Sequence, residues 1–392
     1  MLPTVTDVLI VGGGPTGLAL AISLQKAGID HLLIDKLPHG QNTSRAAVVH
    51  AHTLEMLDGL GVSEVLIREG LPLAKFAIRD RDRPLVQLRF DALPSAYRCL
   101  LMIPQDVTER VLAERLTSLG GTIHRGVAAT AVAQDGKEAR ITLATSADAH
   151  AVRAKYVVGA DGMHSVVRAA AGIAFKGSTY EESFVLADVK MRWSLGTDEV
   201  SLFFSPAGLV VVAPLPSGQF RIVATLDDAP ERPGTNDIQR LIDARGPQGV
   251  ANHIDEVVWS SRFRLHHRVA DSYRNGRLLL MGDAAHVHSP AGGQGMNTGL
   301  VDAVVLGRLL VDVLLYGKPE AALDDYSRLR RPAAAEVLEL AGRLTGMATT
   351  RSAPRRLIRN ALLRTMDTLP PAKNRLIMNL SGLSRKRFTQ AA

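Results

Sequence analysis

A glycine-rich turn near the N-terminus constrains this chain more than any other feature. Gly12, Gly14 and Gly17 follow an apolar run at residues 6–11 and open a helical apolar pattern over residues 15–27. This spacing lets Gly12 form a tight turn, Gly14 admit a pyrophosphate close to the backbone, and Gly17 pack the helix on the strand. The pattern predicts a strand, a turn and a helix that together bind a dinucleotide.

An acidic residue closes the next short apolar run, at residues 31–35. Asp35 stands 18 residues beyond Gly17, where a carboxylate accepts hydrogen bonds from an adenosine ribose. The N-terminus of the helix adds backbone N–H donors and the positive end of its dipole. The residues themselves leave open whether the dinucleotide is NAD or FAD. The contacts expected in this unit are Gly12, Gly14, Pro15, Thr16, Gly17, Asp35 and Lys36.

Apolar runs that are far apart in the sequence indicate an interleaved fold. Residues 155–159 and 277–281 each lead into a Gly and an Asp, so both are expected to return to one sheet. Residues 183–225 carry clusters of Val, Leu and Phe typical of a strand meander, and the pattern becomes helical from Gly295 onward. The predicted fold class is α/β, with a Rossmann-type domain interleaved with a β-sheet substrate domain and followed by C-terminal helices. The expected boundaries are 1–75, 100–180 and 270–350 for the dinucleotide-binding domain, 76–99 and 181–269 for the β-rich domain, and 351–392 for basic C-terminal helices.

Composition excludes several other classes of protein. With 392 residues, of which 46% are hydrophobic, the chain can bury a substantial core and is not disordered. Its net charge of +7 is concentrated at residues 351–392, which hold ten basic residues and one acidic residue, so no nucleic-acid surface is expected on the body. The single cysteine, Cys99, excludes a disulfide framework and a cysteine metal cluster, and it fits a reducing compartment.

Metal-binding and membrane-spanning roles are not expected either. His286 and His288 lack a third ligand at metal-binding spacing. The uncharged stretches at 8–24 and 200–220 are interrupted by glycines or prolines, which would break a spanning helix. We therefore predict a cytoplasmic protein without a metal site.

Two later segments resolve the choice of dinucleotide. Residues 157–168 read VVGADGMHSVVR, and residues 282–297 read GDAAHVHSPAGGQGMN. With the N-terminal GGGPTG, they resemble the three fingerprints of the class A flavoprotein monooxygenases, the para-hydroxybenzoate hydroxylase-like family. The resemblance spans roughly residues 5 to 345, with the fingerprints in the family's order. It implies that the cofactor is FAD, with NADPH or NADH as a transient reductant.

The same resemblance assigns roles to further residues. Asp161 and Gly162 would serve a region shared by FAD and the nicotinamide, and Asp283 would bind the ribityl chain. A weaker match places Arg45 at the FAD phosphates and Gln105 near the flavin, with a backbone contact to adenine at Ala129. The sequence departs from the family at His52, where relatives carry an arginine before Thr-Leu-Glu. The residues expected to wrap the isoalloxazine ring are Pro290, Gly293, Gly295, Met296 and Asn297.

The resemblance implies hydroxylation of a phenolic or other electron-rich aromatic with O2, through a flavin 4a-hydroperoxide. We expect the apolar strands near residues 200–225 to wall the substrate pocket, but the sequence selects no catalytic base. The expected partners are a small aromatic substrate and O2, and the chain is expected to be a monomer or a homodimer. Two alternatives stay open: a membrane-associated hydroxylase of quinone precursors, and a flavin reductase or dehydrogenase that never inserts oxygen.

The basic C-terminal segment has two interpretations. Residues 354–369 place Leu357, Ile358 and Leu362 on one helical face and most arginines off it. Either this apolar face packs against the body, with the arginines in solvent, or the helix lies on an anionic membrane surface. The first interpretation is favoured because most amphipathic helices in globular proteins bury their apolar face.

Overall fold

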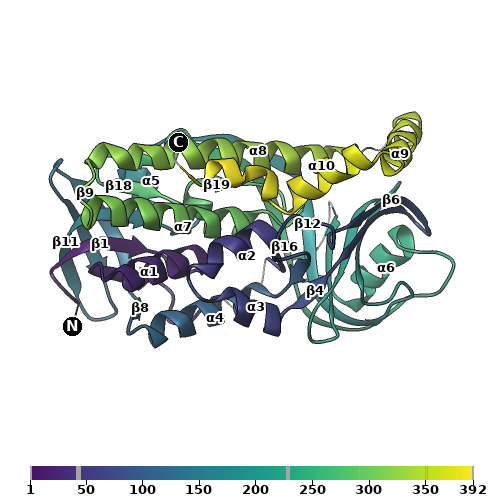
Figure 1. Ribbon diagram of the computed structural model, residues 1–392. Helices are drawn as coiled ribbons and strands as arrows, with labels where there is room; N and C mark the ends of the chain where they lie inside the picture. Colours follow the sequence, from purple (N-terminus) through teal and green to yellow (C-terminus); the bar gives the residue numbers. More distant parts are fainter. Residues whose placement is uncertain are drawn as a thin grey trace.

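The computed structural model describes residues 2–40, 46–226, 230–290, 292–348, 350 and 352–390 (Figure 1). It confirms the predicted N-terminal unit: strand β1 (Val5–Val11), helix α1 (Pro15–Ala27) and strand β2 (His31–Asp35). The two strands pair in parallel, and the apolar half of β1, from Val8 to Val11, is buried. This arrangement fixes the glycine turn at the carboxyl end of β1.

The first sheet brings distant segments of the chain together, as the apolar runs predicted. Strands β11 (Ala149–Gly159) and β18 (Leu278–Leu280) extend it in parallel beyond β1. Helix α1 packs between α7 (Gly295–Leu314) and α4 (Gln105–Ser118). The sheet order is β17 (Arg274–Asn275), β18, β11, β1, β2 and β8 (Ile123–Arg125), with β10 (Ala139–Ala144) paired to β11 and to β9 (Ala128–Gln134).

The second sheet contains the predicted meander and is antiparallel except where β13 meets β5. The segment from 183 to 225 contributes consecutive pairings, so the alternating apolar clusters there were interpreted correctly. Helix α6 (Thr235–Arg245) packs against its strands. The sheet order is β19 (His286–Val287), β16 (His253–Ala270), β12 (Phe175–Arg192), β15 (Phe220–Thr225), β14 (Gly208–Pro214), β13 (Glu199–Ser205), β5 (Lys75–Asp80) and β6 (Arg83–Arg89).

A small third sheet and the remaining helices complete the fold (Figure 1). The small sheet has the order β3 (Val48–His50), β7 (Leu100–Met102) and β4 (Leu71–Leu73). The segment after Gly295 is helical, as predicted. None of the helices in the described ranges combines the length and apolarity needed to cross a bilayer. The other elements are α2 (Ala51–Asp58), α3 (Ser63–Glu69), α5 (Val166–Ala170), α8 (Asp324–Ala348), α9 (Ala353–Asp367), α10 (Pro370–Leu380) and the short 3-10 helices η1 (Gly282–Ala284), η2 (Glu320–Leu323) and η3 (Leu383–Phe388).

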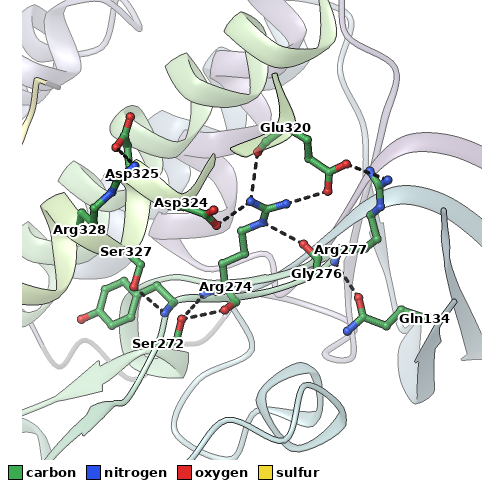
Figure 2. A network of polar contacts seen from close by, with 11 residues as sticks. Gln134, Ser272, Arg274, Gly276, Arg277, Glu320, Asp324, Asp325, Ser327 and Arg328 are labelled. Carbon is green, nitrogen blue, oxygen red and sulfur yellow. Dashed lines mark hydrogen bonds and ion pairs between the residues drawn. The ribbon is translucent and has the colours of Figure 1, made fainter. Parts of the chain in front are cut away.

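An ion-pair network fastens the start of α8 to the amino-terminal edge of the first sheet (Figure 2). Arg274 donates through Nη1 to Asp324 Oδ1 (2.7 Å) and through Nη2 to Glu320 Oε1 (2.7 Å). Arg277 Nη2 lies 2.9 Å from the other oxygen of Glu320. The arginine side chains are largely buried, whereas Glu320 and Asp324 are exposed, so each ion pair by itself contributes little to stability. The network lies at the edge opposite the carboxyl ends of the strands, where ligands bind in open α/β sheets.

Candidate active site

The three sequence fingerprints meet at the carboxyl edge of the first sheet. Strands β1, β2, β11 and β18 run parallel, so the segments that follow them emerge side by side. Gly12 N donates to Ile34 O at 2.8 Å, and Ala160 N donates to Val11 O at 2.8 Å. Met281 N donates to Gly159 O at 3.0 Å. These bonds hold the glycine turn, the second fingerprint and the third fingerprint against one another.

A single cavity of about 780 Å³ opens at this edge and extends toward the second sheet. Fifteen of the residues predicted to bind the cofactor line it. Gly17 and Asn297 do not line the cavity, and Arg45 lies outside the residues that the structure describes. The fifteen are Gly12, Gly14, Pro15, Thr16, Asp35, Lys36, Gln105, Ala129, Asp161, Gly162, Asp283, Pro290, Gly293, Gly295 and Met296.

The glycine turn has the geometry that a close approach of a ligand requires. Gly12 has a φ of 111°, and a Cβ there would lie 2.3 Å from Ala160 O. A Cβ on Gly17 would lie 1.9 Å from Gly12 O, so Gly17 allows the close packing of α1 that was predicted, and its contact with a cofactor stays a prediction. A Cβ on Gly14 would meet nothing within 4 Å, although Gly14 lines the cavity. The cradle therefore has room for a pyrophosphate at the N-terminus of α1.

Asp35 holds the glycine turn as well as facing the cavity. Its Oδ2 accepts a hydrogen bond from Gly13 N at 2.7 Å, and its Oδ1 accepts one from Leu37 N at 2.8 Å. A carboxylate has about four lone-pair positions, so both oxygens keep acceptor capacity. The predicted contact with a ribose is compatible with this geometry and stays a prediction.

Asp161 leaves one buried oxygen available for a ligand. Its Oδ2 accepts from Val166 N at 2.7 Å and from Val167 N, whereas its buried Oδ1 has no hydrogen-bond partner among the described residues. Burial raises the pKa of Asp161 above its usual range. Since a buried, unpaired carboxylate oxygen is costly, a bound group with an O–H or N–H donor fits this position.

Arg168 links the second fingerprint to the third. Its Nη1 donates to Ala284 O at 2.8 Å, and its Nη2 donates to Met163 O at 2.7 Å. The guanidinium also stacks over the Phe175 ring, 4.0 Å from the centroid. Arg168 thereby fixes the spacing between the two loops that line the cavity.

Asn297 does not line the cavity, and its predicted contact with the flavin ring stays a prediction. Its Oδ1 accepts from His50 N at 2.8 Å, and its Nδ2 donates to Val48 O (2.9 Å) and Gly293 O (2.7 Å). The side chain therefore ties the third fingerprint loop to β3. Gly293 is needed there because its φ is 62° and a Cβ would lie 2.2 Å from Val48 Cγ1.

The C-terminal segment clamps the same loop from the other side, which the sequence did not predict. Gln294 is buried; its Nε2 donates to Leu380 O at 3.0 Å, and its Oε1 accepts from Arg385 Nη2 at 2.7 Å. Burial lowers the pKa of Arg385 to about 10. His52, the position where the sequence departs from the family, packs beside Gly382 and lies outside the cavity. No local sequence signal links Arg385 with Gln294.

The other end of the cavity is apolar and is walled mainly by the second sheet. The predicted strands near 200–225 supply several of its side chains, and their use as the wall of a substrate pocket stays a prediction. Side chains that the sequence did not single out come from β5, β7, β16 and the C-terminal helices. The apolar lining at this end is Phe76, Ile78, Phe90, Leu100, Met102, Phe184, Leu186, Val200, Leu202, Leu209, Val211, Ala213, Val223, Phe263, Leu344, Leu376 and Leu380.

A buried ion pair interrupts this apolar wall. Arg221 lines the cavity and donates through Nε and Nη2 to the two oxygens of Asp188, each at 2.6 Å. Its Nη1 donates to Ala46 O at 3.1 Å. Of the five N–H groups on a guanidinium, these bonds use three, so two remain for a ligand. The two residues face each other across β15 and β12, in a register that the sequence alone does not give.

His288 offers a neutral acceptor to the cavity. Its Nδ1 lies 2.8 Å from Ser289 O, so Nδ1 carries the proton and Nε2 carries the lone pair. Nε2 is buried with no hydrogen-bond partner among the described residues, and the side chain lines the cavity. Burial, the main cause, lowers the pKa of His288 to about 4. Within the described ranges, no group of three His, Cys, Asp or Glu residues is arranged to hold a metal ion.

The fold and the cavity define a dinucleotide-binding enzyme of the flavoprotein type. Residues 5–341 match the family model described as the FAD binding domain. The chain is 34% identical to the 6-methylpretetramide 4-monooxygenase of Streptomyces rimosus over 389 residues, which cover 96% of this chain and 69% of that protein. It is 33% identical to the pentachlorophenol 4-monooxygenase of Sphingobium chlorophenolicum, with 85% of this chain and 63% of that protein covered.

Solved structures give the same result. The p-nitrophenol 4-monooxygenase of Pseudomonas putida superposes with a TM-score of 0.88 at 26% identity, covering 98% of this chain and all of that chain. The anhydrotetracycline hydroxylase of Streptomyces rimosus superposes with a TM-score of 0.80 at 32% identity, covering 97% of this chain and 76% of that one. The chain belongs to the FAD-dependent class A flavoprotein monooxygenases.

Proposed function

We propose that this protein uses NADPH or NADH and O2 to hydroxylate a phenolic or other electron-rich aromatic compound. One observation carries the proposal: a single cavity joins a glycine-lined cradle to an apolar chamber. The cradle suits a dinucleotide, and the chamber suits an aromatic ring. The named relatives act on pentachlorophenol, p-nitrophenol and 6-methylpretetramide. The apolar lining of the cavity and the similarity to these relatives therefore both favour an aromatic substrate.

The residues at the cradle would hold FAD along its length. Gly14 and the N-terminus of α1 would receive the pyrophosphate, and Asp35 the adenosine ribose. The family resemblance supplies the other proposed contacts. They are Arg45 with the phosphates, Gln105 with the flavin, the backbone of Ala129 with adenine, and Asp283 with the ribityl chain. When bound, FAD supplies the hydride-accepting and oxygen chemistry that no amino-acid side chain provides. The N-terminus of α7, at Gly295, would place a positive dipole end beside the ring.

The residues at the apolar chamber would exclude water and orient the substrate. Arg221 can direct its two remaining N–H donors at a phenol oxygen and favour the phenolate, which is the more electron-rich form. His288 Nε2, neutral at pH 7, can accept a hydrogen bond from an O–H or N–H of the bound ligand. The surrounding aliphatic and aromatic side chains keep water away from the reacting atoms.

Anaerobic mixing tests the reaction directly. The purified protein, loaded with FAD, would be mixed with NADPH or NADH, with and without a panel of phenols and quinone precursors, while flavin absorbance is followed. We expect at least one aromatic compound to accelerate bleaching and, once oxygen is admitted, to yield its hydroxylated product. Rapid bleaching in all mixtures without an oxygenated product would instead establish a flavin reductase or dehydrogenase. Failure to take up FAD would overturn the cofactor assignment.

We also propose that the enzyme acts in the cytoplasm as a monomer or a homodimer. Its partner there is a small aromatic substrate and not a nucleic acid. A product confined to lipid-soluble quinone precursors in the panel would favour the membrane-associated hydroxylase over one acting on water-soluble phenols.

A further inference from the structure

Helix α9 exposes an apolar stripe that none of the described residues covers. Leu357, Ile358 and Leu362 are 72%, 62% and 65% exposed, and Leu369, just beyond the helix, is 49% exposed. At about 100° per residue these side chains fall on one side of the helix. In Figure 1, α9 projects from one end of the molecule. The favoured expectation from the sequence, that this face packs against the body, is therefore wrong.

The opposite face of α9 fixes the helix to the body, so the exposure is built into the fold. Leu363 is buried, and the Arg359 guanidinium stacks over the Phe204 ring at 4.7 Å while donating to Met347 O at 2.9 Å. Asn360 Nδ2 donates to Asp80 Oδ2 at 2.8 Å. The buried face therefore carries directed polar contacts, and turning the apolar stripe inward would break them.

Cationic residues flank the exposed stripe. Arg355 and Arg364 are exposed, and on the helical wheel they lie at the two edges of the stripe. The single acidic residue of the helix, Asp367, faces the body, where it accepts a hydrogen bond from Gln87 N at 3.0 Å. The outward face of α9 is therefore apolar in the middle and positive at its margins, the pattern of a helix that lies in a lipid interface.

We infer that α9 docks this protein on an anionic lipid surface. A second copy of the chain is a poorer occupant, because pairing α9 with its own copy would bring arginines against arginines. The stripe consists of four apolar side chains, whereas a stable interface takes about 20 to 30 residues from each partner. Anionic headgroups complement the flanking arginines, and the acyl region accepts the leucines and the isoleucine.

The docking surface is separate from the cofactor cavity. No residue of α9 lines the cavity, whereas Leu376 and Leu380 of the following helix, α10, do. Because α10 follows α9 and lines the apolar end of the cavity, docking through α9 would bring that end of the cavity toward the lipid. The inference does not rest on the proposed reaction, since the stripe and its flanking charges exist whatever the enzyme oxidises.

Vesicle flotation tests the inference with the FAD-loaded full chain. Vesicles of phosphatidylcholine with phosphatidylglycerol are compared with vesicles of phosphatidylcholine alone. We expect the protein to float with the anionic vesicles and bind the neutral ones at least tenfold more weakly. The triple variant L357S/I358S/L362S and the double variant R355Q/R364Q should each reduce binding at least tenfold. The matched control is L315S/Y316S, which removes exposed apolar side chains at the end of α7 (49% and 73% exposed) and should bind like the wild type.

Three results would overturn the inference. The first is absence of binding to anionic vesicles. The second is equal loss of binding in the L315S/Y316S control. The third is a dimer, seen by light scattering, that the L357S/I358S/L362S variant converts to a monomer, because the stripe would then be a contact between two copies. All substituted side chains are exposed, so we expect the variants to keep their FAD and their unfolding temperature, and both are measured alongside.

Discussion

The two ends of the cavity are built from different parts of the polypeptide. At the cofactor end, the wall includes the glycine-rich segments that follow parallel strands, where the path of the backbone shapes the site. At the substrate end, the wall is mainly side chains from an antiparallel sheet and from helices. Backbone geometry is shared by all sequences that adopt the fold, whereas side chains can be exchanged one at a time. The cofactor end should therefore tolerate little change, while the substrate end can be altered without loss of the fold.

The largest effect is expected at Gly17. An alanine there would place its Cβ 1.9 Å from Gly12 O, so α1 must shift away from β1. We expect G17A to destabilise the protein by about 3 kcal/mol or more and to purify with less than a tenth of the wild-type flavin content. Flavin absorbance and thermal unfolding provide the two readouts.

The matched substitution is G14A, which adds the same methyl group at a position where it meets no protein atom. That Cβ lies more than 4 Å from every protein atom outside residues 13–15. Without FAD, the free energy of unfolding of G14A should therefore differ from that of the wild type by no more than about 0.5 kcal/mol. Its affinity for FAD should nevertheless fall at least tenfold, because the methyl group occupies the space of the pyrophosphate. Normal FAD affinity in G14A would show that the cofactor does not approach this turn.

An effect of comparable size on stability is expected at the substrate end, at Arg221. Replacing it in R221M leaves the Asp188 carboxylate buried without its partner, which should cost about 3–5 kcal/mol in urea unfolding. The double variant R221M/D188L replaces the pair by apolar side chains, so most of that stability should return. If Arg221 orients the substrate, the double variant will bind FAD normally but will have lost the acceleration of flavin bleaching by phenols. Acceleration as in the wild type would contradict this role.

The sequence predicted the cofactor end better than the substrate end, for physical reasons. The turn at Gly12 to Gly17 depends on neighbours close in sequence, so a local pattern was sufficient. The pair of Arg221 and Asp188 depends on the register of two strands, which a single sequence does not specify. The outward face of α9 was mispredicted because amphipathicity gives a helix an apolar side without saying what covers it.

A third and smaller effect is expected where the C-terminal segment supports the cofactor loop. R385M removes the donor to Gln294 Oε1 and leaves that oxygen buried without its 2.7 Å partner. Because Gln294 lies between Gly293 and Gly295, the loop should loosen and the dissociation constant of FAD should rise about tenfold, or about 1.4 kcal/mol. Fluorescence titration of the protein with FAD measures it. R387M removes an arginine of the same 3-10 helix that bonds Glu336 on the surface and should leave FAD binding unchanged.

The smallest effect is a pH dependence that His50 and His288 impose on stability. Burial lowers the pKa of each from 6.5 to about 4 in the folded protein. Below pH 6.5 the unfolded chain therefore binds protons that the folded protein does not, so stability is complete above pH 6.5 and is lost as the pH falls toward 4. At pH 5.5 each histidine should cost about 1 kcal/mol relative to pH 8.

The variant H288Q isolates the contribution of His288, which lines the cavity, to the pH dependence of stability. It should reduce the loss of stability between pH 8 and pH 5.5 by about 1 kcal/mol in urea unfolding. H253Q, at an exposed histidine on β16, serves as the control and should leave the loss as it is in the wild type. An unchanged loss in H288Q would mean that His288 takes up its proton as readily in the folded protein as in the unfolded chain, and is therefore charged at pH 5.5. It would then donate a hydrogen bond to a ligand through Nε2 instead of accepting one.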